Sequence, residues 1–158
     1  MIIFDEKGHV YPYEVIEITL EAFRQTFVDG LENQDYRAKL FAKYLQFNND
    51  LKKAVGIPYF QWMDGSFTTK KPFPGDIDVV TFIDYDHLVK NALIIHHFSE
   101  KSQKLYNVDA HFAVTCAWKH RYHERALKDE LQWKKIFGFS RADDFGVKHP
   151  KGLIKINC

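Results

Sequence analysis

Few cysteines, no long apolar run and almost no net charge exclude several classes of protein at the outset. The chain has 158 residues and two cysteines, Cys116 and Cys158, which form neither a CxxC pair nor a zinc-ligand spacing. We therefore expect free thiols in a reducing compartment. The formal net charge is +1, from 22 basic and 21 acidic side chains, so composition gives no general argument for binding nucleic acid or a membrane.

The sequence also lacks an apolar stretch approaching the roughly 18 residues that a membrane helix needs. The first residues, Met1 to Glu6, become acidic within six positions, which is unlike a signal peptide. Repeats, low-complexity tracts and linkers are missing as well. With 46% hydrophobic residues the chain is long enough to bury a core. We expect one cytoplasmic domain over residues 1–158 and no membrane partner.

Hydrophobic periodicity predicts helices over residues 20–28, 34–54, 84–96 and 120–137, and strands over 59–63, 76–83, 108–117 and 151–157. Residues 1–14 are expected to form a loop or a short strand. The mixture is typical of an α+β fold, a mixed sheet with helices packed on it. We divide the domain into an N-terminal part with two helices (1–56), a core (57–117) and a C-terminal helix and strand (118–158).

Two aspartates, Asp76 and Asp78, flank Ile77 on a predicted strand. The strand period of two places both carboxylates on one face, where they repel each other unless a cation lies between them. Mg²⁺, or Mn²⁺, suits such a site because it takes oxygen ligands and leaves room for substrate phosphates. Alone, however, an Asp-x-Asp pair is more often a solvated strand edge or a helix cap.

A turn, Gly65-Ser66, follows the preceding predicted strand, and the nine residues 67–75 lead from it to Asp76. Glycine lets the backbone approach a phosphate, and the serine hydroxyl and nearby N–H groups can donate to its oxygens. Lys70 and Lys71 add positive charge within the loop. The alternative is an ordinary turn and a solvated hairpin loop.

A third carboxylate, Asp109, lies on the next predicted strand between apolar neighbours. Together with Asp76 and Asp78 it would complete a two-metal site for an in-line displacement. His111 follows on the same strand face and is expected either to line this pocket or to be a partly buried polar side chain. Four other histidines, His96, His97, His120 and His123, lack a matching ligand set for zinc.

Taken in order, Gly65-Ser66, the nine-residue loop, Asp76-Ile77-Asp78 and Asp109 resemble the signature of the DNA polymerase beta-like nucleotidyltransferase superfamily. A closer likeness is to a group of small, mostly uncharacterised bacterial nucleotidyltransferase-like proteins. It covers most of the chain and includes Gly-Ser-Phe-x-Thr-x-Lys before Pro-x-Asp-Ile-Asp, together with Trp133, Phe137-Gly138 and Lys151-Gly152.

The resemblance implies that Asp76 and Asp78 bind the metal that accompanies an NTP such as ATP. It implies that Asp109 binds a second metal and helps to activate an acceptor hydroxyl, while Gly65 and Ser66 hold the β- and γ-phosphates. The acceptor would be a protein, an RNA or a small molecule. Toxin–antitoxin and phage-defence systems are settings that the resemblance suggests for such bacterial domains.

Three features depart from that pattern. Phe67 stands where many members have an arginine, Asp64 adds negative charge before the glycine, and few residues follow the third aspartate strand. A partner protein or a homo-oligomer would then supply the acceptor site, or few residues would bind the acceptor. The basic residues of 117–135 are expected to form a solvated helix face, with contact to an RNA backbone as the alternative.

Three hypotheses follow for the function. The first is a metal-dependent nucleotidyltransferase. The second is an inactive nucleotide-binding or regulatory module, such as an antitoxin or a defence-system subunit. The third is a structural α+β protein in which Asp76, Asp78 and Asp109 do not converge.

Overall fold

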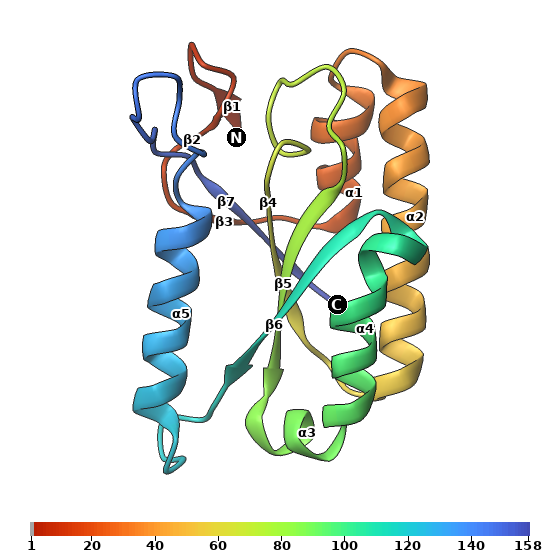
Figure 1. The fold of residues 1–158 in the computed structure, drawn as a ribbon, viewed down its shortest axis with the longest axis vertical. Coiled ribbons are helices and arrows are strands. Elements are labelled where there is room, and N and C mark those ends of the chain that lie inside the picture. The colour runs from red at the N-terminus through yellow and green to blue at the C-terminus, as the bar shows by residue number, and fades with distance from the viewer. Residues whose placement is uncertain (1) are drawn as a thin grey trace.

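A mixed sheet of five strands separates two helical layers in the computed structural model, which describes residues 2–158 (Figure 1). The strand order is β3-β7-β4-β5-β6, with β3 parallel to β7, β5 parallel to β6, and β4 antiparallel to both of its neighbours. The strands are β3 (Val15–Glu17), β4 (Phe60–Asp64), β5 (Ile77–Asp84), β6 (Val108–Thr115) and β7 (Leu153–Asn157). The predicted α+β class is confirmed.

Helices cover both faces of this sheet. The segments α1, α2 and α4 lie on one side and α5 on the other (Figure 1). The helices are α1 (Leu20–Arg24), a π-helical turn η1 (Gln25–Asp29), α2 (Gln34–Val55), α3 (Tyr85–Lys90), α4 (Ala92–Tyr106) and α5 (His123–Phe137). A separate small hairpin pairs β1 (Ile3–Phe4) with β2 (Val10–Tyr11).

The central strand β5 is buried on both faces, which explains why apolar residues occur on both of its faces. Ile77 and Val79 belong to the larger core beneath α1, α2 and α4. Val80 and Phe82 belong to a smaller core that also contains Phe137 of α5. Both side-chain sets are withdrawn from water, so the sheet is held rigidly between two apolar layers.

Local sequence signals set the ends of several helices. The Thr19 hydroxyl accepts a hydrogen bond from the Ala22 amide and so begins α1. Gly56 ends α2 in the left-handed region, with φ of 67° and its N–H bonded to the Lys52 carbonyl. The helix predicted over residues 84–96 is two helices in the structure. The first, α3, has Asn91 as its C-cap, and the second, α4, continues to Tyr106, beyond the predicted end.

Two other expectations differ from the structure. Residues 117–122 form turns, so the last helix begins at His123 and not at His120. The expected N-terminal helical part also contains β3, an edge strand of the main sheet. Its pairing with β7 joins residues that lie almost the whole chain apart, which local pattern cannot reveal. No helix within residues 2–158 has the length and apolar character to cross a membrane.

Candidate functional site

Aspartates gather where β4 ends and where β5 and β6 begin. Asp64 is paired in register with Asp78, and Asp78 with Asp109. Residues paired in this way point to the same face of a sheet, so the three carboxylates share one face. Asp76 lies two residues before Asp78, and its carboxylate accepts a 3.3 Å hydrogen bond from the Gln103 side chain of α4.

The carboxylate charges act on one another. Burial raises the pKa of Asp78, and the nearby charges of Asp76 and Asp109 raise it further. The positive charges of Lys151 and Arg141 oppose this increase. The structure therefore places Asp78 and Asp109 side by side on one face, with Asp76 near enough for its charge to raise the pKa of Asp78. Such repulsion favours either a proton or a cation beside Asp78.

Gly65 lies directly against the carboxylate of Asp78. It has φ of +75°, a conformation that L side chains rarely adopt, and a Cβ at this position would overlap the Asp78 carboxylate. Glycine is thus required twice over, by the turn and by the close approach. The predicted turn and the predicted carboxylate belong to one compact unit.

The turn after Gly65 presents free donors. The Thr69 amide and hydroxyl both donate to the Ser66 carbonyl, at 3.2 and 2.8 Å, and the Thr68 hydroxyl donates to the Gly65 carbonyl at 3.3 Å. Across residues 2–158, no acceptor is found for the N–H groups of Ser66, Phe67 and Thr68. Consecutive unpaired N–H groups are the feature of backbone that binds phosphate oxygens.

A model of a family of unknown function, DUF6932, matches residues 2–157. The chain belongs to the DUF6932 family. No curated protein and no solved structure matches it. The function of this DUF6932 chain must therefore be argued from its own residues.

Asp64, whose negative charge departs from the superfamily pattern, is neutralised by an ion pair in the DUF6932 fold. Its Oδ1 lies 2.6 Å from Lys151 Nζ, and Asp64 and Lys151 are only 5% and 8% exposed. Burial raises the pKa of Asp64 to about 6; Lys151 and the Gly65 amide counter this effect, and the Asp78 charge adds to it. The cation comes from the end of the chain, 87 positions from Asp64, so spacing gave no sign of the pair.

Arg37 of α2 is a positioning residue that sequence reasoning missed. Its guanidinium is fully buried and donates to four carbonyl oxygens at 2.7–2.8 Å, those of Phe27, Phe67, Thr69 and Lys71. Burial lowers the pKa of Arg37. The signal lies in its spacing, since Arg37 falls on the same buried stripe of α2 as Leu40, Phe41 and Tyr44. An arginine on an apolar stripe indicates that the fold supplies hydrogen-bond acceptors for its guanidinium.

The two loop lysines are not drawn to the carboxylates by any contact among residues 2–158. The Lys70 ammonium lies 5.4 Å from the ring centroid of Phe4, and its amide donates to Gly8. Lys71 is exposed, and its carbonyl is held by Arg37. Their role in nucleotide binding stays a prediction. Phe67, which stands where many members of the superfamily have an arginine, is fully buried and stacked on Phe23.

His111 stands beside the third aspartate. Its Nε2 lies 3.3 Å from Asp109 Oδ1, and its ring centroid lies 4.9 Å from that of Trp133 on α5. It therefore borders the aspartates, which agrees with the alternative in which His111 lines the pocket. His120 and His123 lie elsewhere, near Asp86 and the Cys116 carbonyl, and only His123 is on α5.

The side chains as they stand do not form a ready metal cage. In the part of the chain that the structure describes, no group of three or more His, Cys, Asp or Glu side chains is arranged to hold an ion. The donor set does fit a hard cation, because Asp76, Asp78 and Asp109 offer only oxygen atoms and repel one another. Magnesium, with manganese as the alternative, stays a prediction for this site.

Proposed function

We propose that this protein is a metal-dependent nucleotidyltransferase, which transfers a nucleoside monophosphate from an NTP to a hydroxyl acceptor. The proposal rests mainly on one observation, the placement of the Asp78 carboxylate against Gly65 and in register with Asp109. A phosphate-binding turn and a carboxylate pair on adjacent strands are the two halves that phosphoryl transfer requires.

The turn would bind the triphosphate. Ser66, Phe67 and Thr68 offer unpaired N–H groups, and the Ser66 hydroxyl can add a further donor. Arg37 fixes the carbonyl groups of the loop on the opposite side, so that the loop does not need to reorganise when a ligand binds. This support suits the β- and γ-phosphates, which become the leaving pyrophosphate.

Asp76, Asp78 and Asp109 would hold Mg²⁺ or Mn²⁺. When bound, the metal ions supply charge that neutralises the phosphate oxygens and lowers the pKa of the acceptor hydroxyl. Asp78 is the member whose pKa is raised by burial, and Asp109 has a half-exposed side chain. The acceptor therefore approaches from the Asp109 side.

The transfer step is a substitution at the α-phosphorus of the NTP. The acceptor oxygen forms a bond to that phosphorus, and the bond from it to the β-phosphate bridging oxygen breaks, releasing pyrophosphate. The hydroxyl proton passes to Asp109 and from there to solvent. His111, 3.3 Å from Asp109, orients this carboxylate from the α5 side.

A second function is favoured by one specific observation. Phe67 is buried in the core and Lys70 packs on Phe4, so neither of these positions after the Gly-Ser turn presents a cation to the triphosphate. A protein of this kind would bind nucleotide without transferring it, as a regulatory subunit or antitoxin does. Stabilisation by NTP and Mg²⁺ without product would favour this reading, with about 2.7 kcal/mol expected at a ligand concentration one hundred times Kd.

The test uses NTPs labelled at the α-phosphate, Mg²⁺ and a cell extract as the source of acceptors. We expect label to become attached to an acceptor with the wild-type protein and with D35N, and we expect no transfer with D78N. Asp35 is a matched control because it is an exposed aspartate in the first turn of α2. Equal label transfer by D78N and the wild-type protein, or none by either with all four NTPs, would sink the enzymatic proposal.

A further inference from the structure

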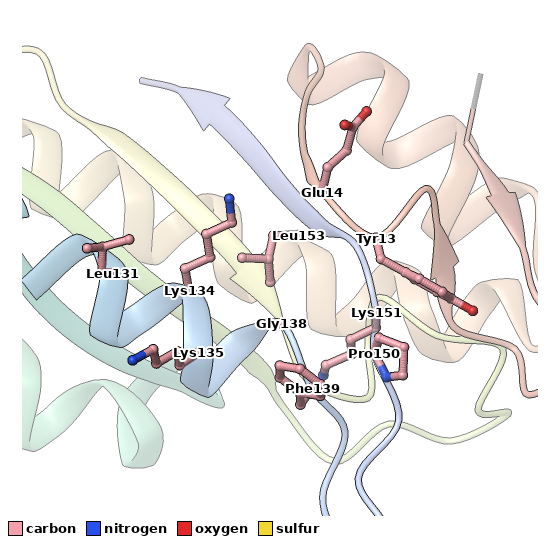
Figure 2. Close-up of a pocket in the computed structure, with 10 residues that line it drawn as sticks. All are labelled: Tyr13, Glu14, Leu131, Lys134, Lys135, Gly138, Phe139, Pro150, Lys151 and Leu153. Atoms are coloured by element: carbon pink, nitrogen blue, oxygen red, sulfur yellow. The ribbon is translucent and has the colours of Figure 1, made fainter.

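A pocket of about 310 Å³ lies beside α5, between this helix and the edge of the sheet (Figure 2). Leu131 and Lys134 line it from α5, Leu153 from β7, and Tyr13 from the segment before β3. Phe139 and Pro150, which form an isolated β-bridge, line the remaining side. Its volume falls within the range of small-molecule sites.

The pocket exists because α5 covers only part of its sheet face. The helix packs against β6 and ends at Phe137, which packs with the buried Leu153 of β7, and the pocket lies between the last turns of the helix and the chain at Phe139 and Pro150. Backbone hydrogen bonds fix the opposite wall, since the Lys151 amide donates to Gly138 at 3.0 Å and the Leu153 amide to Glu14 at 2.9 Å. The pocket is therefore preformed, and a ligand would bind without ordering a loop.

Large apolar side chains converge on this hollow. Leu131 is 59% exposed, Tyr13 46% and Phe139 45%, and each of them turns apolar surface towards the same space. Isolated exposed apolar residues are ordinary, but a concave group of them is typical of a surface that a ligand covers. A ligand that matches this surface would need an apolar body.

The charge at the pocket is positive. Lys134 has no ion-pair partner among residues 2–158, whereas the Lys151 ammonium is already bound to Asp64. Figure 2 shows the Glu14 carboxylate turned away from the space between Leu153 and Phe139. Lys134 and Lys135 outnumber the one carboxylate that lines the pocket, Glu14, so an anionic group at the mouth would be attracted to it.

We propose that this pocket binds a free small molecule with an apolar chain or ring system and one anionic group, such as a carboxylate. Nothing in this inference depends on nucleotide transfer, because the pocket is separated from Asp78 by Lys151 and its partner Asp64. The Lys151 stem is a wall of the pocket, so an occupant would also rest against the residue that neutralises Asp64.

Octanoate is a suitable probe, compared with octylammonium and octanol, which have the same chain and a different head group. Amide chemical shifts of the full chain are followed during each titration. For a ligand of this size we expect a Kd on the order of 1 mM. Octanoate should saturate shifts at Leu131, Gly138 and Phe139, and octylammonium should bind at least about tenfold more weakly, because Lys134 repels it.

Two pairs of variants locate the site. L131W fills the pocket and K134E reverses its charge, and each should weaken octanoate at least about tenfold. L127W and K128E alter exposed positions on the same helix that do not line the pocket, and both should bind as the wild type does. Circular dichroism establishes that all four variants fold.

Several results would overturn the proposal. These are no saturable shift at the three amides, equal affinity for octanoate and octylammonium, or undiminished binding in L131W.

Vesicles of phosphatidylglycerol provide a second experiment. Binding to vesicles without binding of monomeric octanoate would show that the positive apolar surface meets a membrane and not a free molecule.

Discussion

The Asp78 carboxylate occupies the space that a side chain at Gly65 would need. This contact joins the end of β4 to the start of β5 at the point where the two strands pair through Asp64 and Asp78. It makes the glycine of the turn and the aspartate of the strand dependent on each other.

The first prediction concerns this contact. G65A should destabilise the fold by about 2–4 kcal/mol, because the methyl group overlaps Asp78 and φ of +75° is strained for alanine. In a D78A background the same change should cost only about 1 kcal/mol, since the strain at φ remains and the overlap is gone. Urea unfolding of the four proteins measures the difference. Additive costs would show that Gly65 and Asp78 act independently.

A second prediction separates stability from function. Because burial and two neighbouring carboxylates raise the pKa of Asp78, its charge is unfavourable in the folded protein. D78N should therefore raise the free energy of unfolding at pH 7 by about 0.5–2 kcal/mol, while cation binding is lost. Thermal unfolding with and without Mg²⁺ tests both halves. A variant that is less stable than the wild type without Mg²⁺ would contradict the proposed repulsion.

Arg37 gives a third prediction. Its guanidinium holds four carbonyl groups, so R37M should leave them unpaired and cost about 3–5 kcal/mol. Hydrogen exchange should accelerate most at the amides of residues 69–71, which are hydrogen-bonded in the wild type. R24A removes an exposed arginine whose contact with Asp29 is 3.4 Å long, and it should cost no more than about 1 kcal/mol. Similar costs for both variants would rule out the positioning role.

The Asp64 carboxyl should titrate at a pH of about 6, which carbon NMR of the aspartate side chains can follow. Its folded pKa lies above the ordinary value of 3.8, so the folded state binds the proton more tightly than the unfolded state does. This group therefore lowers the free energy of unfolding as pH rises from about 4 to about 6, by up to about 3 kcal/mol.

Lys151 supplies the control for that titration. Because its ammonium favours the charged form of Asp64, K151M should raise the pKa of Asp64 further. D64N should remove the titration, and the stability of the wild type relative to D64N should fall between pH 4 and pH 6. An Asp64 carboxyl that titrates near 3.8 in both proteins would show that burial does not act on it.

Parts of this structure could be predicted from sequence because they depend on local chemistry. The helix cap at Thr19, the glycine end of α2 at Gly56 and the apolar run of β5 each follow from residues within one element. The Asp76, Asp78 and Asp109 set could be proposed because strand alternation fixes the face on which a side chain lies.

Other parts depend on contacts between distant segments. The sequence marks Asp64 as a misplaced charge, and only the return of the chain to Lys151 explains it. Arg37 lies within the predicted helix over residues 34–54, and that pattern gives no sign that its partners belong to η1 and the loop after Gly65. Lys70 was expected near phosphate from its place in the loop, yet it packs over Phe4 in the N-terminal hairpin.

The central claim is that Asp76, Asp78 and Asp109 form one cation and nucleotide site with the turn at Gly65. Crystals grown with Mn²⁺ and a non-transferable NTP analogue test it most directly, since anomalous scattering locates manganese. We predict manganese between the Asp76 and Asp78 carboxylates, and phosphate oxygens on the N–H groups that follow Gly65. Manganese and analogue bound elsewhere, or carboxylates left without any ion at saturating concentrations, would contradict the account.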